Sequence, residues 1–286
     1  MNIRIHENGW TVLVEDFDIK DLTQEQAKLI TKHLLKNTVV VFKNQSLSPE
    51  DEIRVCGLFG KIENYHDTNI NDNFILDNSD GFISRVTGEL NDKGLPGVFG
   101  HEHELEWHCN RVSDPNRNPF VWLYSERGSQ GSRTSYLNNI LTYNDLSDEK
   151  KQEFAKIKLN VGEVVQFTDY LWKEGTVPPD ISSYRPNLVH TNELGVTGLF
   201  FSWNQIHFIE GMPHEEGRKF IEELRQFAEQ EKYMYHHDWE DGDIVIAEQN
   251  LSIHKRWEFK HMDKRVLHRI TFDYSNINIS ELNEIS

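Results

Sequence analysis

A chain of 286 residues can bury a sizeable core, and its 16 Phe, 9 Tyr and 7 Trp residues supply aromatic surface for a binding pocket. The formal net charge of −17 argues against binding to nucleic acid or to an anionic membrane surface, because both need clustered Lys and Arg. An active site for an anionic ligand must therefore bring its own local positive charge.

The cysteine content and the first residues predict a cytoplasmic protein. Cys56 and Cys109 are too few for a disulfide framework or a cysteine-rich zinc site, and they fit a reducing compartment. Residues 1–6 are followed by polar residues without the apolar core of a signal peptide, and no run reaches transmembrane length. We expect no membrane partner. The sequence leaves open whether the chain forms a homo-oligomer.

The first 60 residues predict two helices on either side of a buried strand. A helix is expected to open at 21–26, where Thr23 can cap it and Gln26 completes a capping box. The β-branched run at 38–42 predicts a short buried strand. Ser48 is expected to cap a second helix, which starts with a proline in its first turn.

The segment 63–100 is polar and rich in glycine, and it shows little periodicity. We expect a long loop here. Long loops in compact domains are often functional, and this loop runs directly into a histidine-containing stretch. We therefore expect it to act as a lid beside the active site.

The rest of the chain predicts many short strands interrupted by one long helix. Helices are expected at 147–157 and 215–230, and the tail 276–286 is expected to be frayed. Such an order favours a single α+β domain over 1–286 that is mainly β, with a double-sheet core. The expected strands are 120–124, 161–167, 188–190, 199–203, 244–247 and 266–274.

The stretch 104–110 carries the first candidate metal ligands. If it is a strand, His108 and Asn110 point to one face and Cys109 points to the other, where core packing is expected. Two histidines and one carboxylate form the facial triad that holds non-haem Fe(II) with three open positions. The distant second histidine is His254, but the carboxylate position holds an asparagine.

A second group of motifs surrounds His254. The turn 239–243 and the apolar run 244–247 precede it, and Arg265 and Arg269 follow it. This order resembles the taurine dioxygenase-like (TauD/TfdA) branch of the Fe(II)- and 2-oxoglutarate-dependent oxygenases. In that family a W-x-x-G-D turn and a strand precede the distal iron ligand. An arginine eleven residues later grips the far carboxylate of 2-oxoglutarate, and a second arginine four residues beyond it is common.

The upstream motifs are similar to the same family. Trp107 and His108 match the start of its W-H-x-D motif, and 131–134 resembles the turn whose threonine contacts the cosubstrate. The start of the chain is similar too, so the resemblance covers most of residues 10–275.

The resemblance implies a double-stranded β-helix (jelly-roll) core with flanking helices, and an enzyme that uses Fe(II), 2-oxoglutarate and O₂. It implies release of succinate and oxidation, most often hydroxylation, of a small polar or anionic molecule such as an amino acid. No catalytic residue is expected beyond the metal centre. The residues implied are His108, Asn110 and His254 for the metal, Thr134, Arg265 and Arg269 for the cosubstrate, and Arg269 alternatively for an anionic substrate. Phe201 and Trp203 lie two apart on an expected strand and share its face, so they could line a substrate pocket or pack in the core.

Asn110 keeps three alternatives open. Its amide oxygen is a neutral and weaker donor, so the chain is also compatible with a catalytically silent or regulatory relative that binds 2-oxoglutarate or another small molecule. Family members that add halide lose the carboxylate to Ala or Gly, and Asn only partly frees that space. A cupin-like or zinc site at 101–106 is the third alternative, but it leaves Arg265 unexplained.

Overall fold

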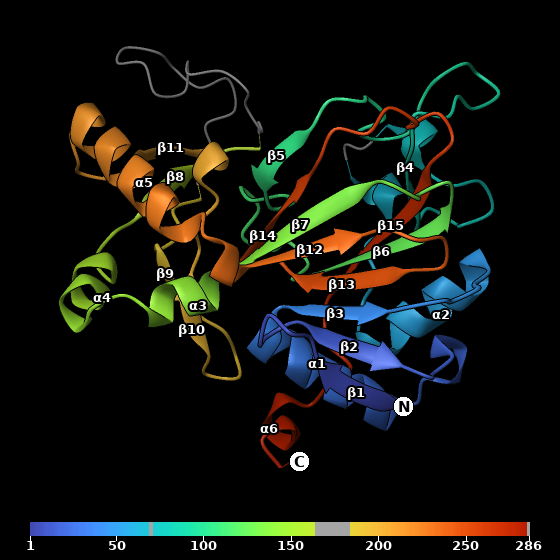
Figure 1. Ribbon diagram of the computed structural model, residues 1–286, viewed down its shortest axis with the longest axis horizontal. Coiled ribbons are helices and arrows are strands. Elements are labelled where there is room, and N and C mark those ends of the chain that lie inside the picture. The colour runs from blue at the N-terminus through green and yellow to red at the C-terminus, as the bar shows by residue number, and fades with distance from the viewer. Residues whose placement is uncertain (69–70, 164–183, 285–286) are drawn as a thin grey trace.

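Two sheets form the centre of the molecule (Figure 1). The computed structural model describes residues 1–68, 71–163 and 184–284. In the described chain the larger sheet comprises β1 (Asn2–Ile5), β2 (Val12–Glu15), β3 (Val39–Phe42), β13 (Ile244–Glu248), β6 (Phe120–Arg127), β15 (Val266–Phe272) and β4 (Ser84–Val86), in this spatial order. The smaller sheet comprises β12 (Met234–Asp238), β7 (Arg133–Asn138), β14 (Ser252–Arg256) and β5 (Leu105–His108), also in spatial order. Spatial neighbours come from distant parts of the chain, as in a jelly roll, and the predicted fold class is confirmed.

The central strands of the larger sheet are buried on both faces. In β13, Ile244 and Ile246 lie in the core beneath the helices, whereas Val245 and Ala247 lie in the core between the two sheets. The same alternation holds in β6, where Trp122 faces the helices and Leu123 faces the smaller sheet. Burial on both faces explains why these strands read as continuous apolar runs.

Helices α1 (Gln24–Asn37) and α2 (Pro49–Phe59) contribute the side chains that cover the outer face of the larger sheet. Thr23 caps α1 in a capping box with Gln26, as predicted. Ser48 caps α2, and its partner in a second capping box is Asp51. The two helix starts were predictable because capping is a local interaction.

The described part of the tail, residues 276–284, includes a helix, contrary to the expectation of a frayed tail. Helix α6 (Ile279–Leu282) packs against α1, and the Leu282 side chain is fully buried. Lys28 of α1 lies 2.7 Å from the carboxylate of Glu281. The sequence of so short a helix carries little periodicity, so only its tertiary contacts reveal it.

A smaller group of elements adjoins the two sheets at the left of Figure 1. Their apolar side chains form a separate core with residues of β5, β7 and β14. These elements are α3 (Asn139–Asn144), α4 (Asp148–Phe154), β8 (Leu159–Val161), β9 (Val189–Thr191), β10 (Thr197–Leu199), β11 (Ile206–Ile209) and α5 (His214–Ala228).

Three expected segments differ from the structure. The expected loop 63–100 contains β4, which pairs with β15 and so belongs to the larger sheet. The expected strand 161–167 is seen only as β8, and residues 164–167 lie outside the described chain. The expected strand 199–203 ends at Leu199, and a 3-10 turn follows at Trp203–Gln205. The pairing of β4 with β15 and of β8 with β11 joins segments far apart in the chain, which local propensity does not record.

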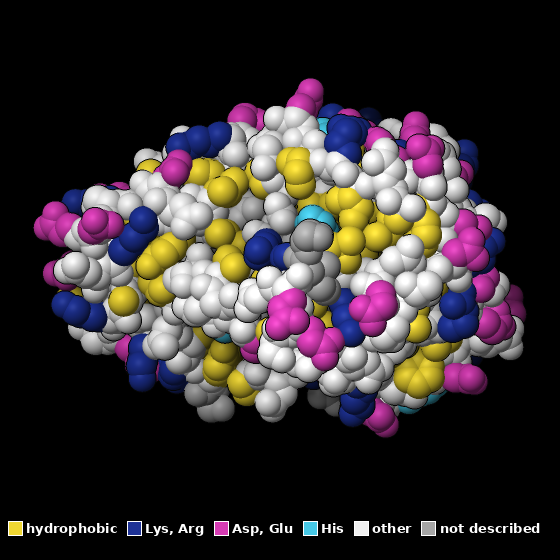
Figure 2. Space-filling view, turned by 90° about the horizontal axis from the view of Figure 1, so that it is seen from below, with side chains coloured by type: hydrophobic (Ala, Val, Ile, Leu, Met, Phe, Trp, Pro, Cys, Tyr) yellow, Lys and Arg dark blue, Asp and Glu magenta, His cyan; other side chains and the backbone are white. Residues whose placement is uncertain are grey.

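The surface carries charges of both signs close together, as the face in Figure 2 shows. Cys56 and Cys109 are both buried free thiols. Within the described residues, no helix has the length and apolar character needed to cross a bilayer.

Docking of α6 gives a prediction about stability. Leu282→Ala removes a fully buried side chain, so we expect it to lower the free energy of unfolding by about 2–3 kcal/mol. Chemical denaturation followed by tryptophan fluorescence measures this change. Glu284→Ala, at an exposed position of the same tail, is the control and should change stability by less than about 0.5 kcal/mol. Equal stability of the two variants would mean that α6 does not dock.

Candidate active site

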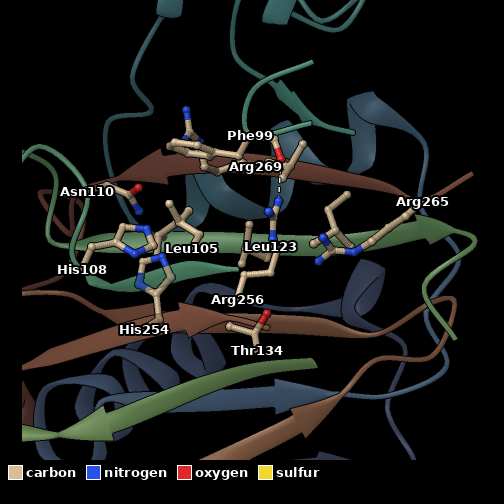
Figure 3. A pocket seen from close by; sticks show the side chains of 13 residues that line it. Phe99, Leu105, His108, Asn110, Leu123, Thr134, His254, Arg256, Arg265 and Arg269 are labelled. Carbon is tan, nitrogen blue, oxygen red and sulfur yellow. Dashed lines mark hydrogen bonds between the residues drawn. The ribbon is translucent and has the colours of Figure 1, made fainter. Parts of the chain in front are cut away.

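The two candidate histidines lie side by side on neighbouring strands. His108 of β5 pairs with His254 of β14 in the sheet register, and their ring centroids are 4.2 Å apart (Figure 3). The Nδ1 of His108 lies 2.6 Å from the carbonyl oxygen of Glu106. A carbonyl can only accept, so Nδ1 carries the proton and Nε2 is left with a free lone pair for a metal.

Both imidazoles are neutral at physiological pH. Burial lowers the pKa of His108 to about 4, and the nearby positive charges of Arg269 and Arg256 act in the same direction. Burial also holds the pKa of His254 well below its usual range, with further lowering by His108 and Arg269. Neutral imidazole is the form that ligates metals, so the pair needs no deprotonation before it binds one.

Asn110 lines the same cavity as the two histidines, although the strand that was expected to carry it ends earlier. β5 stops at His108, and Asn110 lies in the turn that follows. Cys109 is buried in the core with Trp107, as expected, and burial raises the pKa of its thiol to about 11. Asn110 therefore reaches the cavity through the turn and not through strand alternation.

A β-bulge shapes the wall beside the histidines. His254 pairs with His108 and Arg256 pairs with Leu105, so two steps along β14 match three steps along β5. Because of this extra residue, Leu105 and His108 both face the cavity.

The far end of the cavity is formed by β15. Strand alternation turns Leu267 and Arg269 toward the cavity, and Arg265, which directly precedes β15, lines it too, whereas His268 points to α2, where it contacts Glu52. Arg265 and Arg269 are buried, and neither forms an ion pair with any described residue. The Nε atom of each lacks a hydrogen-bond partner there. Burial lowers the pKa of Arg265 to about 9, so an anion beside it would relieve a real desolvation cost.

Thr134 of β7 lies on the same cavity wall. Its hydroxyl oxygen accepts a hydrogen bond of 2.9 Å from the indole Nε1 of Trp239. The hydroxyl proton is therefore free to be donated to a ligand. Trp239 belongs to the turn that precedes β13, so the turn that the sequence singled out orients a cavity residue.

Arg256 is a cavity residue that the sequence analysis missed. It lies two residues after His254 on β14, so the alternation rule alone would have placed it on the same face. Its guanidinium donates to the backbone carbonyls of Phe99, His101 and His103. Arg256 therefore holds the segment 99–103 against the cavity, and Phe99 becomes part of its wall (Figure 3).

Two of the candidate substrate residues lie elsewhere. Phe201 and Trp203 do not line the cavities beside the histidines, and instead pack on each other in the core with ring centroids 5.6 Å apart. They were expected to share the face of a strand, but Trp203 belongs to a 3-10 turn. Local spacing could not distinguish a core pair from a pocket pair.

The alternative metal site at 101–106 lacks the necessary geometry. His101 and His103 lie in exposed bends, with ring centroids 6.3 Å apart. Across the described residues, no three His, Cys, Asp or Glu side chains are close enough to hold a metal. Asn110 lines the same cavity as the histidine pair and is the candidate for a third donor there.

The residues present fit an iron ion and a dicarboxylate cosubstrate. Two neutral imidazoles and the Asn110 side chain, whose amide oxygen can act as a third donor, line one end of the cavity. The Arg265 guanidinium, which among the described residues hydrogen-bonds only to the Met262 sulfur at 3.7 Å and whose Nε has no partner there, offers a fork for a carboxylate at the far end. When bound, iron and 2-oxoglutarate supply the oxidising chemistry. The protein contributes orientation, positive charge and a wall of apolar side chains that excludes water.

Comparison with known proteins agrees with this geometry. The family model described as "Taurine catabolism dioxygenase TauD, TfdA family" matches residues 8–271. The alpha-ketoglutarate-dependent 2,4-dichlorophenoxyacetate dioxygenase of Burkholderia sp. (strain RASC) is 23% identical over 266 residues, covering 87% of this chain and 86% of the relative. Pentalenolactone F synthase of Streptomyces arenae is 22% identical over 200 residues, which cover 65% of this chain and 67% of the synthase.

Solved structures share the fold. AAD-2 in complex with Mn(II) and N-oxalylglycine aligns with a TM-score of 0.78 and 20% identity, covering 96% of this chain and 98% of its own. A taurine dioxygenase from Burkholderia xenovorans aligns with a TM-score of 0.73 and 18% identity, over 92% of this chain and 85% of its own.

The protein is an Fe(II)- and 2-oxoglutarate-dependent dioxygenase built on a jelly roll. The chain belongs to the TauD, TfdA family. The cofactor prediction of Fe(II), 2-oxoglutarate and O₂ is thereby confirmed.

The position of Arg265 gives a prediction about cosubstrate affinity. We expect Arg265→Ala to weaken binding of 2-oxoglutarate by about 2–4 kcal/mol, roughly 30- to 1,000-fold, because a buried carboxylate loses its charged partner. Anaerobic calorimetry with Mn(II) in place of Fe(II) measures the affinity without turnover. Arg127→Ala removes an exposed arginine of β6 and should leave the affinity unchanged. Unchanged affinity in Arg265→Ala would contradict the assignment.

The hydrogen bond from Trp239 to Thr134 gives a second prediction. Thr134→Val keeps the side-chain shape but removes the hydroxyl, so we expect 2-oxoglutarate to bind about 5- to 30-fold more weakly, or about 1–2 kcal/mol. Trp239→Phe removes the indole donor and keeps the hydroxyl, so it should lower stability while retaining most of the affinity. If the two variants lose affinity equally, Thr134 acts only through the packing of this wall.

Proposed function

We propose that the protein couples the decarboxylation of 2-oxoglutarate to the hydroxylation of a small organic anion, such as an amino acid or a sulfonate-like acid. His108, His254 and Asn110 hold the iron. Arg265 and Thr134 hold the far carboxylate of 2-oxoglutarate. Arg269 assists the cosubstrate or binds the anionic group of the substrate.

The observation that carries this proposal is the uncompensated positive charge of the inner cavity. Arg256, Arg265 and Arg269 all line it, and none of the described residues that line it is acidic. A divalent metal adds further positive charge, and the dianionic cosubstrate offsets only part of the total. An anionic substrate is the ligand that this excess favours, in a protein whose overall charge is strongly negative.

An adjoining outer cavity offers the space for such a substrate. It has a volume of about 600 Å³ and shares its inner wall with the first cavity at Phe99, Leu105, His108, Asn110 and Arg269. A substrate in it would therefore lie against the metal position.

Arg269 is placed to orient the substrate. Its guanidinium lies 5.7 Å from the ring centre of Tyr65 and 5.8 Å from that of Phe99, and the three residues line the outer cavity together. The carboxylate of Glu63 lies on the same wall, but it is already ion-paired with Arg111 and accepts a hydrogen bond of 2.7 Å from Thr271. A cation and aromatic faces in one cavity suit an acid that also carries an apolar part.

The names of relatives support an acid as the substrate class. Two curated relatives are named for 2,4-dichlorophenoxyacetate and (S)-phenoxypropionate, and a structural neighbour is titled a taurine dioxygenase. At 18–24% identity these names indicate a class of compound and not a particular one.

Asn110 favours one second candidate, a relative that binds 2-oxoglutarate or a small molecule without turnover. A neutral amide holds iron less firmly than a carboxylate does, and the site keeps one more positive charge. Halide addition is less well supported, because the Asn110 side chain occupies part of the space that a halide would need.

An anaerobic titration of Fe(II) and 2-oxoglutarate into the metal-free protein separates the two candidates. We expect the visible metal-to-ligand charge-transfer band to form with the unmodified protein, and succinate release with an acid substrate once O₂ is admitted. If the band forms but no organic acid in a screen stimulates succinate release, the binding role replaces the enzymatic one. If neither the unmodified protein nor Asn110→Asp forms the band, the metal assignment is wrong.

A further inference from the structure

Gln249 contacts the irregular third position of the metal site. It follows β13, its side chain is buried, and its backbone N–H donates to the carbonyl of Pro119 over 2.9 Å. The side-chain Oε1 accepts from two atoms of Asn110, the backbone N–H at 3.1 Å and the amide Nδ2 at 3.2 Å. The Nε2 of Gln249 donates to the carbonyl of Asn118 over 2.8 Å.

We infer that Gln249 is a positioning residue that makes an amide, and not a carboxylate, the matched side chain at position 110, beside the two histidines. This inference rests on the proposed function, because it concerns the third donor of the same site.

The orientation of the Gln249 amide follows from two backbone groups. The N–H of Asn110 can only donate, and the carbonyl of Asn118 can only accept. Turning the Gln249 amide by 180° would place its NH₂ group against the N–H of Asn110 and its oxygen against the carbonyl of Asn118. Two repulsive contacts would replace two hydrogen bonds, so Oε1 faces Asn110.

This orientation determines which side chain suits position 110. The atom that lies 3.2 Å from Oε1 of Gln249 must be a donor, and in Asn110 it is the NH₂ group. An aspartate would place a second acceptor there, which costs a buried hydrogen bond and adds repulsion. With Nδ2 engaged, Oδ1 is left as the free atom, and it accepts no hydrogen bond from the side chains and backbone that the structure describes. Asn110 and Gln249 thus form a complementary pair.

The chain contains a matched control for this pair. Gln205 is also buried, and it forms hydrogen bonds with Cys109, the residue that precedes Asn110. Its Oε1 accepts from the Cys109 N–H at 2.9 Å, and its Nε2 donates to the Cys109 carbonyl at 3.0 Å. These bonds reach only the backbone of Cys109. Loss of Gln205 therefore disturbs the same turn without changing what residue 110 faces.

The first test uses the metal-free full chain in EDTA and measures thermal unfolding. We expect Asn110→Asp to lower Tm by about 2–8 °C in the unmodified protein and in Gln205→Ala, because two acceptors then face each other. In Gln249→Ala the same substitution should lower Tm by less than about 2 °C, since the opposing oxygen is gone. The inference is overturned if Asn110→Asp lowers Tm by the same amount in all three backgrounds.

The second test measures binding of Mn(II) alone, by calorimetry, to the same six proteins. We expect Gln249→Ala to weaken Mn(II) binding about 10- to 100-fold, since the amide that presents Oδ1 is no longer held. Adding Asn110→Asp should strengthen binding far more in Gln249→Ala than in the unmodified protein or in Gln205→Ala. Equal strengthening in every background would overturn the inference.

The two tests also separate this inference from the proposed function. If none of the six proteins binds Mn(II), the proposed metal site fails, and the thermal measurements still decide whether Gln249 selects the amide. If Mn(II) binds but the thermal and affinity effects are independent of Gln249, the metal site stands and the pairing does not.

Discussion

Buried positive charge without a protein counter-ion is the constraint on which the site depends. Arg256, Arg265 and Arg269 lie between two sheets, and none forms an ion pair with a described residue. Burying an unpaired charge costs several kcal/mol in general, so the fold must supply that free energy through its apolar cores. The cost is recovered when an anion binds. Without a bound anion, the protein is therefore less stable than it would be with neutral side chains in these positions. Binding of an anion removes this cost, and the free energy so released strengthens the binding.

The jelly roll can bury these charges because one face of the larger sheet stabilises the fold and the other face lines the cavity. The larger sheet is buried on both faces, and the side chains under α1 and α2 form a core that is independent of the site. The cavity lies on the other face, where apolar residues such as Val121 and Leu267 alternate with the charged ones along the strands. The smaller sheet contributes the histidine pair and Thr134, and the larger sheet carries Arg269 on β15, so both sheets supply polar groups to one cavity.

Asn110, the proposed third metal ligand, has a neighbour that suits an amide at this position. A neutral donor at Asn110 makes the site still more positive, which is consistent with a cavity built for anions. Gln249 offers an oxygen to the Asn110 amide, so the surrounding structure matches the asparagine that is present. The departure from the family motif is thus accompanied by a partner that suits it.

Local features of the sequence determined much of this protein. Capping residues predicted the starts of α1 and α2, and apolar runs predicted the central strands, because both depend on near neighbours. The resemblance of the chain's motifs to those of the TauD/TfdA family predicted that His108, Asn110, Thr134, His254, Arg265 and Arg269 belong to one site, and all six line one cavity. Tertiary structure alone decided the rest. No local pattern records contacts with another element or with partners more than a hundred residues away. Four features depend on such contacts: the pairing of β4, the docking of α6, the core position of Phe201 and Trp203, and the contact between Gln249 and Asn110.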